Sequence, residues 1–332
     1  MFGRRLWSPG RPAMTSCAPV RWGFLGAGFV ASRGLAPAVH DATGAVLQVV
    51  AARELSRAEL LEPVRAVDSY AAVCEADDVD VIYVSLPNDD HLPWVLAALE
   101  AGKHVLCEKP LALNAAQVVE MMTTAQRFGT MLVEASWNRW HPRTRRVEAL
   151  LDSVDSQIDV RAWFTFPGVP ADNYRLDPHR GGGALLDVGC YPIAAALMAL
   201  GDDATVTGAE QHVGPTGVDL TTTATLISGR GRAQILGSFE RSESQGWTMT
   251  APDLALRLPH PAFTSWRAAS TLIVVDGGIE RVETFDPCDA YRLMVEAVSA
   301  RASGRDAWVL PLATSLGVAR AIDSVARMAR TS

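Results

Sequence analysis

The stretch Val20-Arg21-Trp22-Gly23-Phe24-Leu25-Gly26-Ala27-Gly28-Phe29-Val30-Ala31 decides the fold of this chain. Its first half is a mostly apolar, strand-sized run, and its second half fits GxGxxA, a variant of the dinucleotide-binding turn. In such a turn Gly26 permits the tight bend, Gly28 lets a pyrophosphate approach the backbone, and Ala31 allows close packing of helix on strand. A helix that begins near Phe29 and Val30 would direct its free N–H groups toward the phosphates. The alternative is a turn with a purely structural purpose.

Outward from this turn, strand-like and helix-like segments alternate up to residue 137. The expected strands are near-continuous apolar runs, which suit a parallel sheet that is buried on both faces. Asn before a helix, as its N-cap, and Gly just after its last turn are the residues expected at helix ends. The strands are Val20–Leu25, Val46–Ala52, Val79–Leu86, His104–Cys107 and Thr130–Ala135, and the helices are Pro93–Ala101 and Asn114–Phe128. The pattern predicts an α/β fold, with a doubly wound Rossmann sheet over residues 20–137.

The remainder, residues 138–332, has a different pattern. Many of its segments alternate polar and apolar residues, which predicts an α+β domain on an open, mostly antiparallel sheet. Gly277-Gly278 can turn one hairpin. The expected strands are Ile158–Phe166, Thr205–Val213, Leu220–Ser228, Arg232–Glu240, Thr271–Val275 and Ile279–Phe285, and the helices are Leu185–Leu200, Asp289–Ala302 and Leu312–Arg330.

Composition excludes several classes of protein. The 332 residues carry a formal charge of −7, whereas a duplex-binding protein usually has a basic surplus, so we expect no nucleic-acid partner. No apolar run approaches the roughly 18–20 residues that cross a bilayer, so we expect no membrane partner. The five cysteines lack a CxxC and the seven histidines lack metal-ligand spacing. This predicts reduced thiols, no metal site and a cytoplasmic protein.

Residues 1–19 match no element and are predicted to be a disordered or misannotated tail. The pair Arg4-Arg5 resembles a twin-arginine export signal, but no apolar stretch follows it. Translation could start at Met1 or at Met14.

The end of the second predicted strand indicates which cofactor is preferred. An NAD enzyme usually has Asp or Glu there to hold the ribose hydroxyls, but this chain has Ala52 and Arg53, with Arg57 one turn on. A small neutral residue followed by Arg leaves room for a 2′-phosphate and supplies donors for it. We therefore expect NADP rather than NAD. Glu54 is the counter-argument, because a shift of two residues would place it near the ribose.

Two further segments carry candidate catalytic groups. Lys109 follows the strand His104–Cys107, and ligands of open α/β sheets bind beyond the carboxyl ends of strands. Farther on, Gly181-Gly182-Gly183 precedes a helix in which Asp187 and Tyr191 are four residues apart and share one face. A carboxylate and a phenol beside a lysine can handle a proton. A capping Asp and a core Tyr are the alternatives.

At these residues the sequence resembles the Gfo/Idh/MocA family of oxidoreductases, from about Val20 to the C-terminus. The most specific pieces are Ala101-Gly102-Lys103-His104-Val105-Leu106-Cys107-Glu108-Lys109-Pro110 and Gly181 to Pro192. Supporting pieces are Leu86-Pro87-Asn88 with His91, and Glu134 followed by Arg139-Trp140-His141-Pro142. In having Tyr at position 191, the chain resembles the dihydrodiol dehydrogenase, glucose-fructose oxidoreductase and sugar-nucleotide ketoreductase branches.

The resemblance implies roles for residues. Lys109, Asp187 and Tyr191 would be catalytic. Cofactor-binding residues would be Gly26, Gly28, Phe29, Val30, Ala52, Arg53, Arg57, Leu86, Pro87, Asn88, His91, Glu108 and Lys109. Position in the chain, and not the resemblance, indicates substrate contacts. Trp137 and Arg139 follow the last strand of the first unit, and Tyr174 and Arg175 come just before the three glycines, so all four would face substrate. The tryptophans could equally be inter-domain packing, and His179 is more simply a loop residue.

One departure concerns the second sheet. Thr250-Ala251-Pro252-Asp253 stands where the family often has Gly-Thr-x-Gly. Because Pro cannot donate a ladder hydrogen bond, we expect the strand there to be interrupted or at an edge.

The expected reaction is hydride transfer between NADP(H) and a CH–OH or C=O group of a sugar, sugar nucleotide or cyclic diol. Tyr191 would be the general acid/base, Lys109 would stabilise the alkoxide and favour Tyr191 as an acid near neutral pH, and Asp187 would orient the lysine or a substrate hydroxyl. The alternatives are a cofactor-retaining glycosidase of the same family and a non-catalytic NADP-binding regulator. The family also implies a homodimer or homotetramer formed through the exposed sheet.

Overall fold

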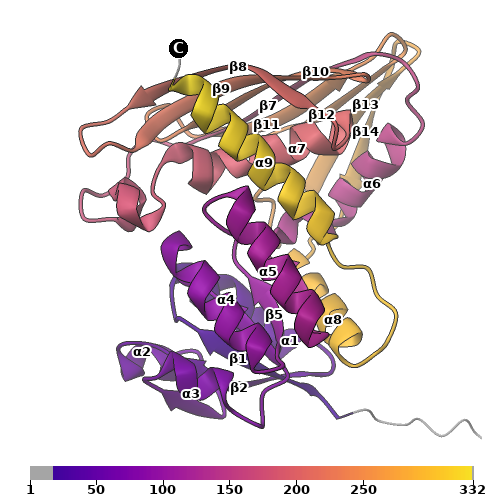
Figure 1. Cartoon of the computed structure of the whole chain (residues 1–332). Coiled ribbons are helices and arrows are strands. Elements are labelled where there is room, and N and C mark those ends of the chain that lie inside the picture. The colour runs from indigo at the N-terminus through magenta and orange to yellow at the C-terminus, as the bar shows by residue number, and fades with distance from the viewer. Residues whose placement is uncertain (1–17, 331–332) are drawn as a thin grey trace, which may run out of the picture.

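The chain, seen in a computed structural model that describes residues 18–330, is built around two sheets (Figure 1). Most of the predicted tail, residues 1–17, lies outside the described residues. The first sheet has six parallel strands in the order β3-β2-β1-β4-β5-β6. They are β1 Val20–Leu25, β2 Ala45–Ala51, β3 Arg65–Val67, β4 Val81–Val84, β5 His104–Cys107 and β6 Leu132–Glu134. This doubly wound sheet confirms the predicted fold class.

Helices cover both faces of the first sheet. Two clusters of buried apolar side chains, one on each face, hold the layers together. The helices of this half are α1 Ala36–Asp41, α2 Leu55–Glu59, α3 Tyr70–Cys74, α4 His91–Glu100 and α5 Ala115–Phe128. As predicted, Asn114 caps α5, accepting a hydrogen bond from Gln117 N, and Gly129 ends it at a φ of +65°.

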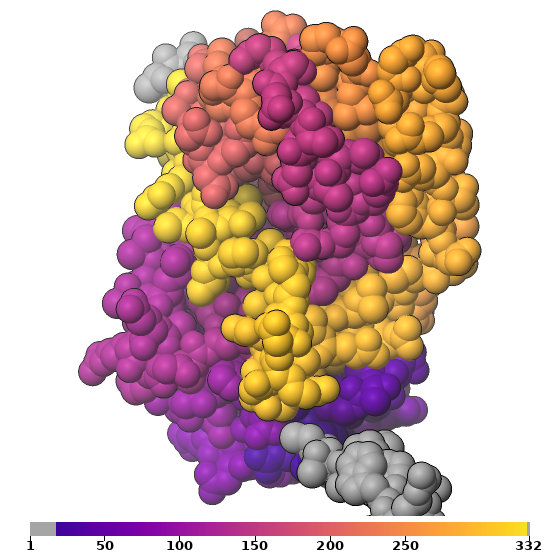
Figure 2. Space-filling view, turned by 90° about the vertical axis from the view of Figure 1, so that its right-hand side faces the viewer, coloured from indigo at the N-terminus to yellow at the C-terminus, as the bar shows by residue number. Residues whose placement is uncertain are grey.

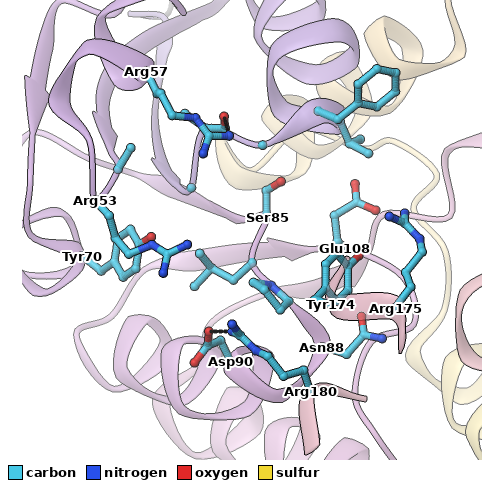
Figure 3. A pocket seen from close by; sticks show the side chains of 18 of the residues that line it. Arg53, Arg57, Tyr70, Ser85, Asn88, Asp90, Glu108, Tyr174, Arg175 and Arg180 are labelled. Atoms are coloured by element: carbon cyan, nitrogen blue, oxygen red, sulfur yellow. Dashed lines mark hydrogen bonds and ion pairs between the residues drawn. The ribbon is translucent and has the colours of Figure 1, made fainter. Parts of the chain in front are cut away.

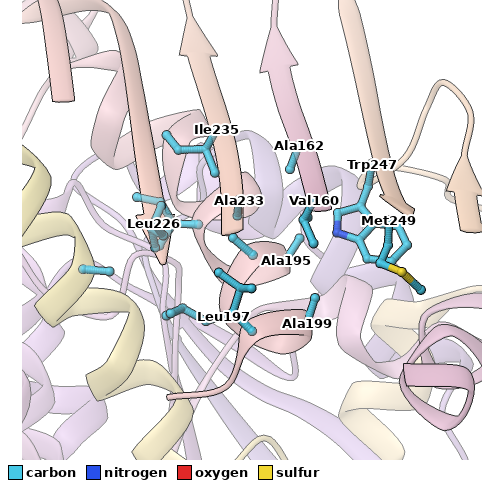
Figure 4. Close-up of a cluster of buried hydrophobic side chains, with 14 of the residues drawn as sticks. Val160, Ala162, Ala195, Leu197, Ala199, Leu226, Ala233, Ile235, Trp247 and Met249 are labelled. Atoms are coloured by element: carbon cyan, nitrogen blue, oxygen red, sulfur yellow. The ribbon is translucent and has the colours of Figure 1, made fainter. Parts of the chain in front are cut away.

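The second sheet has eight strands in the order β14-β13-β12-β11-β7-β10-β9-β8 and is antiparallel except where β7 pairs with β10. Its strands are β7 Ile158–Thr165, β8 Thr205–Val213, β9 Asp219–Ser228, β10 Gly231–Ser238, β11 Ser244–Thr250, β12 Leu254–Leu258, β13 Ser270–Asp276 and β14 Ile279–Phe285. Three helices, α6 Pro142–Leu151, α7 Cys190–Leu200 and α9 Leu312–Ala329, pack on one face of it. Side chains of the sheet such as Val160 and Ile235 interlock there with Ala195 and Leu197 of α7 (Figure 4).

Two expectations about the second half need correction. Pro252 does not interrupt an edge strand: it lies in the tight connection between β11 and β12, where Ala251 N donates to Leu254 O, and both strands are inside the sheet. The sequence also contains a helical run that meets the length and composition of a membrane span, Pro178–Leu200, although none was expected. In this run, 67% of an 18-residue window is buried within the protein, because α7 forms the core beneath the second sheet.

Helix α8, Ala290–Ala302, connects the two halves. Although it comes late in the chain, its residues Tyr291, Met294 and Val295 belong to the hydrophobic cluster of the first sheet. The division of the chain at residue 137 stays a prediction, and the structure adds that α8 packs with the first of the two predicted units.

Candidate active site

A cavity of about 460 Å³ lies beyond the carboxyl ends of β1, β2, β4 and β5 (Figure 3). All of the predicted cofactor-binding residues except His91 line it. Tyr174, Arg175 and Asp187 close it from the second half of the chain. The structure therefore brings together segments that lie more than 150 residues apart, from the first turn to the helical turn Leu185–Gly189 that carries Asp187.

The glycine turn after β1 leaves a backbone surface that a ligand can approach. Gly26 has a φ of +99°, and a Cβ there would lie 2.5 Å from the carbonyl oxygen of Ser85, so the tight bend requires glycine. At Gly28 a Cβ would meet only Ser85 O, at 3.9 Å. Protein packing does not exclude a side chain at Gly28, and the open space fits the phosphate approach expected of a dinucleotide.

Two arginines stand at the end of β2. Arg53 is exposed at the cavity, and Arg57 donates from Nη2 to the carbonyl oxygen of Ala27 at 3.0 Å. Figure 3 shows both side chains entering the cavity from the same side. Glu54 lines the cavity as well. The guanidinium groups supply the donors that a 2′-phosphate requires.

Lys109 is held where β5 meets the helix that carries Asp187. Its Nζ donates to the backbone oxygen of Asp187 at 2.7 Å and lies 3.4 Å from Oδ1 of the same residue. Arg175 donates from Nε to Oδ2 of Asp187 at 2.7 Å. Lys109 Nζ is also 5.0 Å from the ring centroid of Tyr191. The three predicted catalytic residues are thus in mutual contact through Lys109.

The protonation states of this cluster follow from burial and charge. Burial raises the pKa of the Tyr191 phenol, and the charge of Lys109 opposes the rise without cancelling it. Burial lowers the pKa of Lys109, but Tyr191 and Asp187 outweigh it and the net pKa is raised. Burial raises the pKa of Asp187, yet Lys109 and Arg175 bring it below its ordinary value. At neutral pH the cluster is therefore a neutral phenol, an ammonium and a carboxylate.

Tyr191 and Lys109 share one space, a small cavity, but Lys109 also lines the large one. Lys109 lines both the large cavity and a smaller one of about 20 Å³ behind it, whereas Tyr191 is among the lining residues of the smaller cavity. Around Tyr191, the rings of Phe164 and Phe263 lie 5.3 and 5.9 Å away between centroids. Lys109 is therefore the group shared by the two spaces.

Other predicted residues support the cavity from outside or lie away from it. His91 is fully buried, and its ring nitrogens are each 3.0 Å from the carbonyl oxygens of Pro110 and Leu86, so it joins two cavity loops instead of facing the cavity. Trp137 is not brought to the cavity, because it stacks on Tyr291 in the core of the first sheet. Arg139 lines the smaller cavity and pairs with Glu148. His179 is exposed.

Sequence reasoning missed a second set of contacts at the cavity rim. Arg180 pairs with Asp89 and Asp90, at 3.3 and 3.0 Å, and Asn88 donates from Nδ2 to Gly181 O at 2.8 Å. These bonds tie the loop after β4 to the glycine-rich loop of the second half. Acids and an arginine some 90 positions apart carry no local signal, so only the fold could reveal their pairing.

The chain matches known proteins over nearly its whole length. Residues 20–136 match the oxidoreductase family with an NAD-binding Rossmann fold, and residues 157–250 match the GFO/IDH/MocA C-terminal domain. The chain belongs to the Gfo/Idh/MocA family of oxidoreductases. It is 34% identical to a D-xylose 1-dehydrogenase (NADP(+)) of Haloferax volcanii, over 93% of this chain and 97% of that one.

Two more relatives extend the comparison. A trans-1,2-dihydrobenzene-1,2-diol dehydrogenase of Xenopus laevis is 35% identical over 66% of this chain and 68% of that one. The crystal structure of a 3-ketoreductase from Actinomadura kijaniata, in complex with NADP and TDP-benzene, is similar at a TM-score of 0.87 with 29% identity. It covers 93% of this chain and 98% of its own. The family and the mixed α/β architecture predicted from sequence are confirmed.

Proposed function

We propose that this family member is an NADP(H)-dependent dehydrogenase or ketoreductase that transfers a hydride to or from a CH–OH or C=O carbon of a sugar, sugar nucleotide or cyclic diol. The observation that carries the proposal is the contact of Lys109 with both Asp187 and Tyr191 at the cavity's edge. The names of the relatives give substrates of these kinds, a sugar and a dihydrodiol. The xylose dehydrogenase is named as NADP(+)-dependent, and the 3-ketoreductase structure is a complex with NADP.

The residues present fit the cofactor. The open backbone at Gly28 would receive the pyrophosphate, Arg53 and Arg57 would hold the 2′-phosphate, and Glu108 would lie at the nicotinamide end. Glu108 is itself positioned, because Tyr83 Oη donates to its Oε1 at 2.6 Å. When bound, NADPH supplies the hydride.

The protein's task in reduction is to supply one proton and stabilise one developing charge. Tyr191 is a neutral phenol and would donate its proton to the substrate oxygen, while the Lys109 ammonium would stabilise the negative charge that grows there. Asp187 would fix the position of Lys109, and Arg175 would hold Asp187 from the substrate side. In oxidation the same groups would run the proton transfer in reverse.

The test is NADPH absorbance during incubation of the purified protein with a panel of ketosugars and diols. Loss of absorbance with one of them, and a slower loss with NADH, is the expected result. Release of free sugar from a glycoside without net loss of NADPH would favour the glycosidase. If the protein binds NADPH, does not consume it with any of the substrates, and releases no sugar, the result would favour a regulator.

We also propose that the chain forms a homodimer or homotetramer through the open face of the second sheet. Its helices lie on the other face (Figure 1), and the open face carries Trp163, Ile227 and Val282, of which the last two are 43% and 57% exposed. Light scattering of the protein in solution measures the mass; a monomer would contradict this assignment.

A further inference from the structure

The carboxyl group of Glu134, at the end of β6, is buried behind Lys109 and has no part in the reaction proposed above. Its side chain is held on both oxygens: Oε1 accepts from Leu111 N at 3.0 Å and Oε2 accepts from Ser315 Oγ at 2.7 Å. Burial raises the pKa of this carboxyl, and the two hydrogen bonds and the charge of Lys109 oppose the rise. Glu134 is thus a fixed, buried group that can accept and release a proton.

Glu134 shares the small cavity with Lys109 and Tyr191. The volume of this cavity is about 20 Å³. A buried water needs roughly 10–15 Å³ and two to four polar partners. Besides those three residues, Asn138 and Thr314 offer polar groups on its wall. The cavity therefore admits one water between the carboxyl and the Lys109–Tyr191 pair.

A second small cavity shares wall residues with the space beside Glu134, and a surface groove shares wall residues with that second cavity. The second cavity, of about 10 Å³, has Glu134, Ser315, Asn114 and Ile322 among its lining residues. Asn114 and Ile322 also line a surface groove of about 720 Å³. The three spaces thus share wall residues in succession, from Tyr191 to the outside of the molecule.

One face of α9 forms a wall along all three spaces. Thr314 and Val318 line the small cavity, Val318 and Ile322 the second, and Ile322 and Ala326 the groove. These positions recur every four residues, which places them on one side of the helix. Figure 2 shows the yellow C-terminal segment on the surface, so the other side of α9 faces solvent.

We propose that Glu134 returns a proton from solvent to the Lys109–Tyr191 pair through water in these cavities, along a path separate from the cofactor cavity. The inference rests on the proposed function. After each reduction Tyr191 is a phenolate, because its O–H bond has broken as one formed on the substrate oxygen. A solvent proton converts the Glu134 carboxylate to the acid, the acid gives a proton to the water, and the water gives its other proton to the phenolate. One proton enters, and Glu134 ends as it began.

The path would resupply Tyr191 with a proton while cofactor and substrate are bound. Bound cofactor and substrate would fill the large cavity on one side of Lys109, and a proton could then reach the pair through the smaller cavity that Lys109 shares with Tyr191. Several charged or titratable groups face Glu134 and set its electrostatics: Lys109, Glu108 and Cys107 from β5 and its loop, Cys190 from α7, and Arg139 from the segment after β6. Tyr191 is the group among its neighbours that the reaction would leave without its proton.

The test compares hydride transfer with proton uptake in one turnover. Glu134→Gln keeps an oxygen for Leu111 N and a donor for Ser315, but an amide cannot carry the proton. In wild type, NADPH absorbance and a pH-indicator dye should change together. In Glu134→Gln the first hydride transfer should keep its rate, while proton uptake lags and steady-state turnover falls by about 10²-fold. Equal rates of both signals in the variant would overturn the proposal.

Two further variants separate the carboxyl from the hydrogen bonds. Glu134→Asp retains a titratable group and should recover part of the turnover with an altered pH profile. Ser315→Ala removes one hydrogen bond but keeps the carboxyl, so proton uptake should still accompany hydride transfer. A lag in Ser315→Ala equal to that in Glu134→Gln would show that the hydrogen bond, and not the carboxyl, matters, and would sink the relay.

A cofactor-free measurement distinguishes failure of the relay from failure of the proposed function. The infrared band of the protonated Glu134 carboxyl, identified by its loss in Glu134→Gln at acid pH, should shift promptly when the protein is moved into D₂O. A band that resists exchange would exclude a water path to solvent whatever the protein catalyses. Prompt exchange in a protein that consumes no NADPH would overturn the proposed function alone.

Discussion

Lys109 Nζ donates a hydrogen bond to the backbone oxygen of Asp187 across 2.7 Å, and so joins the end of β5 to the turn that begins α7. The two residues are 78 positions apart. Lys109 follows β5 of the first sheet, and Asp187 precedes α7, which packs on the second sheet. The backbone acceptor fixes the ammonium at a short distance, while the Asp187 carboxylate, 3.4 Å away, is shared between Lys109 and Arg175. The contact positions Lys109 between the cofactor cavity and Tyr191.

Tyr191→Phe tests whether the phenol is the proton donor. The variant keeps the ring packed between Phe164 and Phe263, so the fold and the affinity for NADPH should not change. Turnover should fall by about 10²–10⁴-fold, the range expected of positioned acid–base catalysis. Full activity would assign the acid role to Lys109, which lines the large cavity directly. Fluorescence titration with NADPH checks that binding is intact.

Arg53→Ala tests the cofactor preference. Loss of a charge-assisted hydrogen bond to a 2′-phosphate costs about 1.5–3 kcal/mol, or about 10–10²-fold in affinity for NADPH. Affinity for NADH should change little, because NADH lacks that phosphate. Arg320→Ala, an exposed arginine on α9, is the matched control and should affect neither cofactor. Equal losses for both cofactors in Arg53→Ala would remove the assignment.

Five of the six strands of the first sheet could be predicted because their signals are local, whereas the three-residue β3 was not predicted. Strands β1 and β5 begin and end at the predicted residues, since continuous apolar runs and the glycine turn act within a few positions. Strands β11 and β12 were missed as separate elements. Ser244–Thr250 mixes polar and apolar residues and Leu254–Leu258 is short, so their place inside the sheet depends on neighbours from elsewhere in the chain.

The site residues also fall into two groups, those that local signals predict and those that tertiary packing decides. Cofactor-cavity residues follow from position at strand ends, which is a topological rule. Trp137 and His91 show its limit: both lie in the expected segments, but packing decides that one stacks on Tyr291 and the other spans two backbone carbonyls. The direction of a side chain, and long-range partners such as Arg180 with Asp89, depend on tertiary contacts that one sequence does not encode locally.

The two glycines of the phosphate turn should respond differently to alanine. Gly28→Ala places its Cβ in open space, so the free energy of unfolding should be unchanged, while NADPH affinity falls by about tenfold because the methyl group meets the pyrophosphate. Gly26→Ala combines a φ of +99° with a contact of 2.5 Å to Ser85 O, and should lower the free energy of unfolding by more than about 2 kcal/mol. Urea unfolding and NADPH titration of both variants measure the contrast. Destabilisation by Gly28→Ala would show that packing, and not ligand access, requires that glycine.

His141 should make the fold sensitive to acid. Burial and the neighbouring Arg143 lower the pKa of His141 from 6.5 to about 4, and its Nδ1 accepts from Arg143 N at the start of α6. Because the folded state holds the proton less tightly than the unfolded state, this stability is complete above about pH 6.5 and is lost as the pH falls toward 4, by about 3 kcal/mol. His141→Asn keeps a helix-capping oxygen but no titratable ring, so its free energy of unfolding should fall less between neutral pH and pH 4. Urea titrations across that range measure the difference, with His179→Asn, an exposed loop histidine, as the control. Parallel pH profiles for wild type and His141→Asn would show that His141 is not the acid-sensitive group.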